Sequence, residues 1–377
     1  MVARGTFATF KSRSRSIGIA EMYSVEYLPR LNQLSIEIVG NKLDAVTGIK
    51  VEEGKDISIS IKSLDDPVKV RCPIVITTAT PTSIKLQGTK LLICLKVDPQ
   101  AAWQITSQAA GEESGPDKWS CGWLNKRTSK TGSKNEFQFT CSKCQSPLVD
   151  SLRHVFKDMP GDYWYELMDF WHCHKPDNNQ PTDKDYGILT PKDDKTIVIG
   201  SFYLLETVNS SLQLIKENGV ALYACKTCRQ PIGDEFQSVI RLFKWKLNLV
   251  YIKDNQRLVS TYDPLLYAVN LFNTKMQSSA VRKFAIKVNQ ETLCCWIINT
   301  DIDVTIEGRI LPKCLKIWWY SVAQGDKIDS SYEQTEILYQ EVVDILLETL
   351  LNNTINSIVG ISTINYQVSY IPSLLFK

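Results

Sequence analysis

Two Cys-x-x-Cys pairs constrain this chain more than any other feature of its sequence. Cys141 and Cys144 form the first pair, and Cys225 and Cys228 form the second. Two thiolates separated by two residues in a tight turn can occupy neighbouring corners of a tetrahedron around zinc, so two pairs complete a closed structural site. The 80 residues between them are too many for a small zinc finger and indicate two hairpin tips of a larger β-module. The alternative is four unrelated thiols among the 11 cysteines.

The composition is that of an ordinary globular protein. The 377 residues are enough for two or three domains, each with its own core. A hydrophobic content of 44% with 22% charged residues argues against long disorder. The net charge of +2 gives no overall nucleic-acid signature, so any basic patch must be local. No apolar run is long enough to span a bilayer, and we expect no membrane contact.

The N-terminal segment is basic, without the apolar core of a secretory signal. Four cations, from Arg4 to Arg15, precede the first acid, Glu21. This composition leaves two interpretations, a mitochondrial transit peptide or a frayed basic terminus. Without an export signal, paired cysteines indicate metal binding in a reducing compartment.

An antiparallel β-domain with one solvated face is predicted for residues 1–110. Apolar residues alternate along 34–38 and 57–61, and Gly and Pro residues mark the turns between these strands. Cys72 and Cys94 fall inside strands, where we expect small buried hydrophobic residues rather than ligands.

Residues 111–135 form a polar stretch that we expect to be a mobile basic linker. Its functional interpretation is a contact to phosphate or to an acidic partner, and the alternative is a solvated connection. Trp119 and Trp123 could anchor it to another surface, and Cys121 is a spare ligand candidate. The basic arm comprises Lys126, Arg127, Lys130 and Lys134.

Residues 136–240 are the predicted zinc-binding β-module. An amphipathic helix is expected over Asp162–Trp171, with Trp164 and Trp171 on its apolar stripe. His172, Cys173 and His174 follow directly. Adjacent side chains diverge, so at most one or two of them could join the first Cys pair as alternate ligands. The competing interpretation places them in the core or at a partner surface.

Residues 241–377 mix helices and strands, which gives a mainly β chain of the α+β class. Asp263 before Pro264 predicts a helix to about Met276. Strands are expected at 281–288, 292–299 and 314–322. A capping box of Ser330 and Glu333 predicts a second helix from Ser331 to about Leu351.

Taken together, these residues resemble the HECT-like ubiquitin-protein ligase family, whose members are also described as ubiquitin-conjugating-enzyme binding proteins. The resemblance rests on the first Cys pair, Met159–Trp164, Trp171–His174, Gly200-Ser201-Phe202, and the second Cys pair followed by Gly233. The two Cys pairs, each at the tip of a predicted hairpin, are also similar to those of the β-tent zinc fold of cereblon-type and Yippee-type domains. That similarity implies that the four cysteines bind structural zinc and that Cys173 and His174 have another role.

The family resemblance implies a nuclear or cytoplasmic protein linked to two activities. One is ubiquitin transfer from a ubiquitin-conjugating enzyme through a cysteine thioester. The other is pre-mRNA 3′-end processing, in which members bind and stabilise the endonuclease subunit of the cleavage and polyadenylation machinery.

The residues themselves favour a binding protein over a thioester enzyme. A thioester cysteine must be exposed and activated. Cys294 and Cys295 lie in a predicted buried strand, no histidine follows His174, and no HECT-type catalytic motif surrounds Cys314. Cys314 and Cys173 are therefore weak nucleophile candidates.

The leading hypothesis is an adaptor that recognises the endonuclease, with a ubiquitin-conjugating enzyme as a possible further partner. Aromatic residues are the expected partner anchors, although such residues also build cores. They are Trp164, Trp171, Trp318 and Trp319. Direct RNA binding through the basic arm is not favoured by the net charge; it would make the affinity strongly salt-dependent.

Overall fold

In a computed structural model, the protein is mainly β. The structure describes residues 20–52, 55–99, 118–131, 134–159, 190–217, 220–288, 290–323, 325–337, 339–361 and 363–373. Mostly antiparallel sheets and three α-helices make up these residues, in agreement with the predicted class. No helix among them is long and apolar enough to cross a membrane. The chain forms two compact units, the first from 1–105, 301–314 and 355–357 and the second from 106–300, 315–354 and 358–377.

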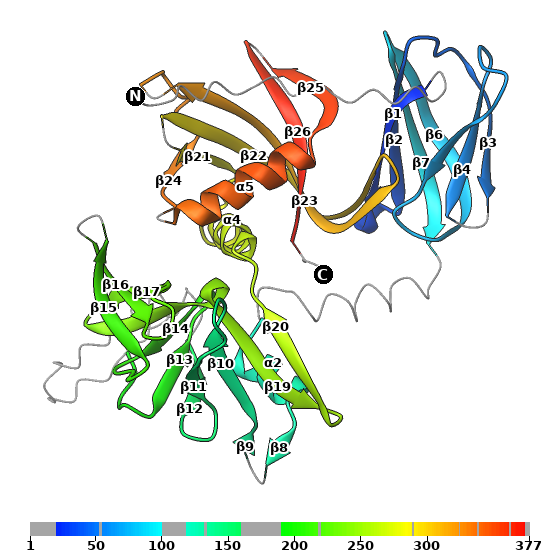
Figure 1. Cartoon of the computed structure of the whole chain (residues 1–377). Coiled ribbons are helices and arrows are strands. Elements are labelled where there is room, and N and C mark those ends of the chain that lie inside the picture. Colours follow the sequence, from blue (N-terminus) through cyan, green and yellow to red (C-terminus); the bar gives the residue numbers. More distant parts are fainter. Residues whose placement is uncertain are drawn as a thin grey trace, which may run out of the picture. The chain divides into compact units, whose positions relative to one another are not determined.

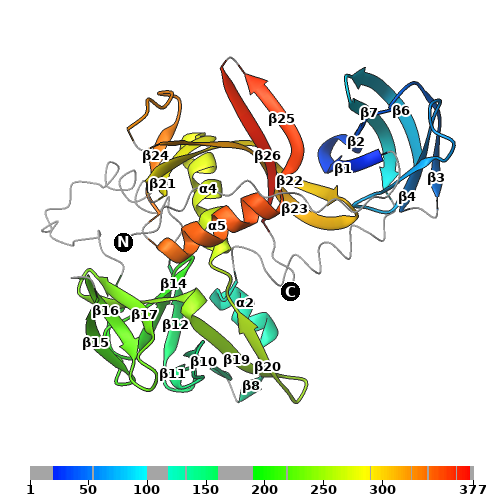
Figure 2. The same ribbon diagram turned by 45° about the horizontal axis from the view of Figure 1, so that its top comes forward.

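The first unit packs two antiparallel sheets around one core. The strands of one sheet follow the order β1 (Ala20–Leu28), β2 (Gln33–Gly40), β7 (Lys90–Pro99) and β6 (Ile76–Gln87), and those of the other β3 (Val46–Glu52), β4 (Asp56–Ile61) and β5 (Val68–Arg71). The short 3₁₀ helix η1 (Pro29–Leu31) links β1 to β2. Ile36 of β2 and Ile59 of β4 belong to the same buried cluster. Figure 2 shows the strands β1, β2, β6 and β7 gathered together with β3 and β4. The alternation in the sequence therefore predicted both inner faces correctly.

The strands β22 (Glu291–Ile306) and β23 (Arg309–Ala323) run well beyond the ranges expected from the sequence. The polar run around Asp301 and Asp303 resembles a loop. Asp303 is nevertheless buried, because its carboxylate accepts the N–H of Lys313 at 2.9 Å. Residues 303–306 then pair with β1 and extend the sheet of the first unit.

The C-terminal part of the second unit is a sheet with helices against it. Its strands follow the order β21 (Lys283–Val288), β22, β23, β26 (Ile364–Pro372) and β25 (Ile355–Ile361). The helices α4 (Leu265–Ser279) and α5 (Gln340–Asn352) share a buried cluster with this sheet (Figure 1). The expected start of α4 is confirmed, since Asp263 Oδ1 accepts the N–H of Leu265 at 2.9 Å.

The predicted start of the last helix is wrong. The short strand β24 (Glu333–Thr335) occupies the expected first turn and pairs in parallel with β21. Glu333 binds Lys275 Nζ at 2.7 Å instead of closing a capping box. Pairing with a strand some fifty residues away supplies backbone hydrogen bonds that the local pattern does not reveal, so α5 begins only at Gln340.

The remainder of the second unit contains the cysteine pairs, and a four-stranded and a seven-stranded sheet form most of it (Figure 1). A four-stranded sheet has the order β11 (Pro147–Asp150), β10 (Phe137–Cys141), β19 (Leu247–Lys253) and β20 (Gln256–Thr261). A seven-stranded sheet has the order β12 (Val155–Asp158), β13 (Thr196–Ile199), β14 (Tyr203–Glu206), β18 (Val239–Phe243), β17 (Pro231–Phe236), β16 (Val220–Cys225) and β15 (Leu212–Glu217).

Residues 118–131 dock on these sheets. The indole of Trp119 is fully buried and donates to Ser260 Oγ at 3.1 Å. The helix α2 (Cys121–Arg127) follows, and β8 (Lys130–Thr131) pairs with β9 (Lys134–Asn135). In the 3₁₀ helix η2 (Lys244–Lys246), the buried ammonium of Lys244 donates to the carbonyl oxygens of Lys118 and Ser201. The expected anchor Trp119 therefore holds this segment in the core.

Candidate metal centre

The turn between β10 and β11 presents the first two thiols. The N–H of Gln145 donates to the carbonyl of Cys141 at 2.9 Å, and the N–H of Cys141 donates to the carbonyl of Ser146 at 2.9 Å. Gln145 has a positive φ of 61°. This tight turn directs Cys141 and Cys144 to the same side.

The turn between β16 and β17 repeats this arrangement. The N–H of Arg229 donates to the carbonyl of Cys225 at 2.8 Å, and the N–H of Cys225 donates to the carbonyl of Gln230 at 3.0 Å. Arg229 has a φ of 58°. Two hairpins from different sheets therefore carry structurally equivalent turns.

A proline ends each of these turns. Pro147 follows the first pair at the same spacing as Pro231 follows the second, giving Cys-x-x-Cys-x-x-Pro twice. Each proline pairs with the residue before the first cysteine, at an irregularity in the strand register. Sequence reasoning used only the cysteines and missed this longer repeat, which would have identified the two turns as equivalent.

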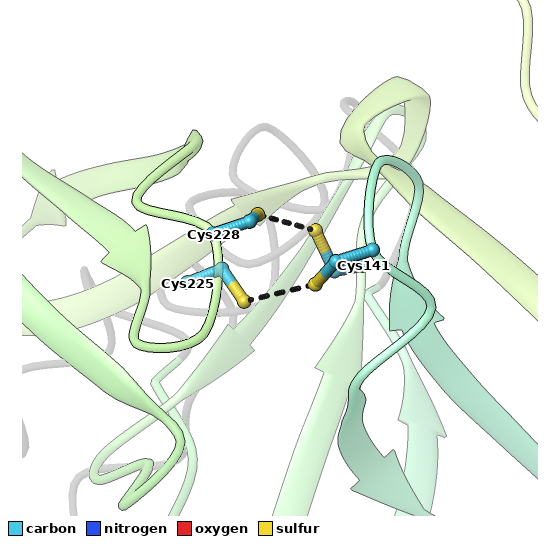
Figure 3. Close-up of side chains that lie close together, drawn as sticks. Cys141, Cys225 and Cys228 are labelled. Carbon is cyan, nitrogen blue, oxygen red and sulfur yellow. Dashed lines mark hydrogen bonds between the residues drawn. The ribbon is translucent and has the colours of Figure 1, made fainter.

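The four sulfur atoms converge between the two turns (Figure 3). Cys141 Sγ lies 3.6 Å from Cys228 Sγ, and Cys144 Sγ lies 3.6 Å from Cys225 Sγ. All four lie within 4.8 Å of one another. Sulfur ligands about 2.3 Å from a central zinc ion stand about 3.8 Å apart in a tetrahedron, so this spacing is close to that of a zinc site with four cysteine ligands.

The chemistry of the four thiols also fits a metal ion. Hydrogen bonds from the side chain and backbone of Ser146 lower the pKa of Cys144 to about 6. Burial raises the pKa of Cys141 to about 12. A divalent cation binds thiolates, and its positive charge would stabilise the buried thiolate of Cys141. The donor set is compatible with zinc, which would have a structural role, since four thiolates leave no open position.

The other ligand candidates do not contribute to this group. Cys121 begins α2 and is not part of the four-thiol cluster found among the described residues. His172, Cys173 and His174 lie outside the described residues, as do the expected helix over Asp162–Trp171 and its tryptophans.

The late cysteines are buried. Cys314 is fully buried, and burial raises the pKa of its thiol well above the ordinary value. Cys294 and Cys295 are also fully buried, and burial raises the pKa of both. A thiol of this kind is protonated at neutral pH and has no access to a second protein in this conformation.

The two late tryptophans occupy different environments. Trp319 is buried in the main core of the second unit. Trp318 is half-buried and meets Trp296 edge to face, with ring centroids 5.5 Å apart. Of these two expected anchors, only Trp318 has surface available to a partner.

Two glycines of the family-like motifs have steric roles. A Cβ at Gly233 would collide with the backbone carbonyl of Arg241 on the neighbouring strand. A Cβ at Gly200 would collide with the ring of Tyr203. The motifs around the second Cys pair and in Gly200-Ser201-Phe202 therefore preserve close packing within the seven-stranded sheet.

Comparison with known proteins gives the following matches. A model of the family described as HECT-like ubiquitin-conjugating enzyme (E2)-binding proteins matches residues 26–356. The uncharacterized protein YJR141W of Saccharomyces cerevisiae is 27% identical over 295 residues, which are 76% of this chain and 79% of the relative. No solved structure matches.

Proposed function

The chain belongs to the family of HECT-like proteins that bind ubiquitin-conjugating enzymes (E2), and on that premise we propose that it is a zinc-stabilised protein-binding adaptor. The convergence of four thiols from two hairpins carries this proposal. A closed four-thiolate site stabilises a fold and leaves no coordination position for substrate. The two hairpins then form a β-tent-like domain, as their resemblance to such domains suggests.

The late cysteines, Cys294, Cys295 and Cys314, support binding rather than catalysis. The three late cysteines are buried with raised pKa values, and the chain has no histidine after His174 to act as a base near them. A transthiolation nucleophile needs exposure and activation, and the late cysteines have neither.

We assign two partners to the adaptor. One is an E2, because of the family. The other is the endonuclease subunit of the pre-mRNA 3′-end cleavage and polyadenylation machinery, because of the resemblance described above. Both partners place the protein in the nucleus and cytoplasm. In this proposal the adaptor holds the endonuclease in a stable form.

The experiment is affinity purification of the full chain, followed by depletion. We expect the endonuclease to copurify with the wild-type chain and its level to fall after depletion. A Cys225→Ser, Cys228→Ser variant should lose the interaction together with its zinc. Normal endonuclease levels after depletion would refute the adaptor role.

The second candidate function is a ubiquitin ligase that accepts ubiquitin on a cysteine. The family's E2 binding favours this candidate. The test is incubation of the purified chain with ubiquitin-charged E2, followed by gel analysis with and without reductant. An adduct that is sensitive to reductant and disappears in Cys314→Ser or Cys173→Ser would identify the acceptor. The adaptor hypothesis predicts no adduct in any of these samples.

A further inference from the structure

A cavity of about 220 Å³ opens in the second unit between α2, β10 and β12. None of the four thiols of the metal centre lines it. Its apolar wall is formed by four side chains, Leu124, Phe137, Val155 and Phe156. The other lining residues carry polar or thiol groups and are Cys121, Asn125, Asn135, Ser151 and His154. Asn135 and His154 are the polar pair of the cavity.

The apolar wall is aromatic and extends to the surface. The ring centroids of Phe137 and Phe156 lie 4.9 Å apart, and the two ring planes are tilted by 56°. Val155 is 52% exposed, and the nearby Leu152 is 45% exposed. Exposed aliphatic side chains beside an aromatic cavity are typical of a site that buries an anchor residue of a partner.

The polar pair presents hydrogen-bond acceptors. The Asn135 amide nitrogen donates to Asn125, while its Oδ1 is buried without a partner in the described part of the chain. His154 Nδ1 lies 2.8 Å from the carbonyl oxygen of Asp150 and therefore donates to it. The neutral ring then keeps Nε2 as an acceptor. A buried acceptor without a donor costs free energy, which a ligand that supplies an N–H or O–H would recover.

The chain around the cavity is basic. Residues 126–158 contain seven Lys and Arg and three Asp and Glu, so this stretch carries +4, whereas the whole chain carries +2. Lys126, Arg153 and Lys157 lie close in sequence to lining residues and are exposed. None of the three forms an ion pair within the part of the chain that the structure describes. Their charge favours an acidic ligand.

We propose that this cavity binds a tyrosine or tryptophan side chain presented by an acidic segment of a protein partner. The ring would lie against Phe156 and Leu124, and its O–H or N–H would donate to Asn135 Oδ1. Acidic neighbours in the segment would approach Lys126 and Lys157. The cavity is smaller than sites for drug-sized molecules and suits one anchor side chain. The inference rests on the proposed function, because it assumes a protein partner.

A peptide fits better than a nucleic acid. The stretch that carries the basic residues also contains Glu136, Asp150 and Asp158, whose carboxylates would repel a phosphate backbone. An acidic peptide can place its few charges beside the lysines and avoid these carboxylates. Single-stranded RNA is therefore the competing ligand in the test.

The direct test uses the full zinc-loaded chain and a fluorescent nine-residue peptide with one central Tyr, one Glu on each side of it and Ser at the other positions. We expect replacement of Tyr by Phe to weaken binding roughly fivefold through one lost hydrogen bond. Val155→Glu should weaken binding at least about tenfold, because it places a carboxylate beside the apolar wall. Asn135→Leu should abolish the preference for Tyr over Phe.

Matched variants keep this test specific. Val208→Glu changes a valine that is 67% exposed, and Lys216→Glu reverses an exposed lysine away from the cavity. We expect both to bind the peptide as the wild type does, whereas Lys126→Glu and Lys157→Glu bind it more weakly. Zinc content and circular dichroism verify folding of each variant. Equal peptide affinity of Val155→Glu and the wild type would overturn the proposal.

A second arm separates this inference from the proposed function. Capture of E2 and endonuclease is compared between the wild type and Val155→Glu. Loss of capture of either partner in the variant supports the cavity as the docking site. Unchanged capture of both overturns the cavity's role and leaves the adaptor function standing. If the wild type captures neither E2 nor the endonuclease but still binds the peptide, the adaptor function is refuted and the cavity proposal stands. Displacement of the peptide by a single-stranded RNA oligonucleotide overturns the assignment to a protein ligand.

Discussion

Removal of one buried cysteine tests whether the two hairpins depend on metal. We consider Cys225→Ser, which replaces a thiol that is fully buried on β16. A serine oxygen is a poor zinc ligand, and three thiolates leave the ion open to solvent. We therefore expect the wild type to contain one zinc per chain and the variant to lose most of it.

The energetic consequence follows from linkage. An ion that binds only the folded state adds about 1.4 kcal/mol of stability for each tenfold rise in free zinc above its Kd. Structural zinc in small finger peptides contributes about 10–16 kcal/mol at neutral pH, which is as large as the whole stability of a typical domain. Loss of the ion should therefore unfold the sheets around the four thiols.

The assay is denaturant unfolding, repeated in a series of buffers in which the free zinc concentration is lowered stepwise. Trp119 is fully buried, Trp245 and Trp319 are nearly so, and all three belong to the second unit, so tryptophan fluorescence reports on the unfolding of that unit. Cys94→Ser is the matched control, since Cys94 is partly exposed on β7 and outside the four-thiol group. The reasoning is refuted if wild-type zinc content is near zero, or if Cys225→Ser and the double variant with Cys228→Ser keep their zinc.

Three further substitutions test the packing of the second unit. Gly233→Ala should destabilise by about 1–3 kcal/mol in denaturant titrations, because its Cβ meets the carbonyl of Arg241; Gly360→Ala, whose nearest neighbour would be 3.6 Å away, should change little. Burial raises the pKa of Glu206 to about 8, so its neutral form stabilises the fold fully below about pH 4.5, and this stability is lost as pH rises toward 8. As the pH rises across that window, the free energy of unfolding of the wild type should therefore fall relative to that of Glu206→Gln, by at most about 1.4 kcal/mol per pH unit. A difference in unfolding free energy between the two proteins that stays constant from about pH 5 to 8 would contradict this. Lys244→Met should cost about 2–5 kcal/mol in the same titrations, since two buried carbonyl oxygens lose their donor.

The features that the sequence predicted well depend on short-range patterns. Burial alternates along β2 with the two-residue period of a strand, and the alternating Ile57, Ile59 and Ile61 of β4 are all buried, so local hydrophobicity was sufficient. The Asp-Pro signal placed the start of α4 for the same reason. The four thiols were grouped because metal ligands follow spacing rules that hold across long gaps in sequence.

The features that were missed depend on long-range pairing. The first turn expected for the last helix became β24 because β21 offered backbone hydrogen bonds to it. The hairpin of β22 and β23 continued through Asp301 and Asp303 because residues 303–306, near its tip, pair with β1. The peptide cavity combines side chains from α2, β10 and β12, and no local pattern brings these together.

The shared strand β10 couples the metal centre to the cavity. Its last residue, Cys141, is a candidate zinc ligand, and its first residue, Phe137, lines the cavity. The two are four residues apart, about 13 Å along an extended strand. The Phe137 N–H also donates to Ser151 Oγ at 2.9 Å, and Ser151 lies just after β11, the second strand of the first Cys hairpin. A hairpin released by zinc loss would therefore no longer hold Phe137 in place.

This coupling predicts that chelation weakens peptide binding without any substitution in the cavity. We expect a zinc chelator to reduce affinity for the acidic Tyr peptide in parallel with zinc release, and added zinc to restore it. Val155→Glu provides the comparison, because it should bind peptide poorly while retaining its zinc. If the peptide binds equally well after complete zinc release, the cavity does not depend on the metal centre. The four thiols would then stabilise only the hairpins that carry them.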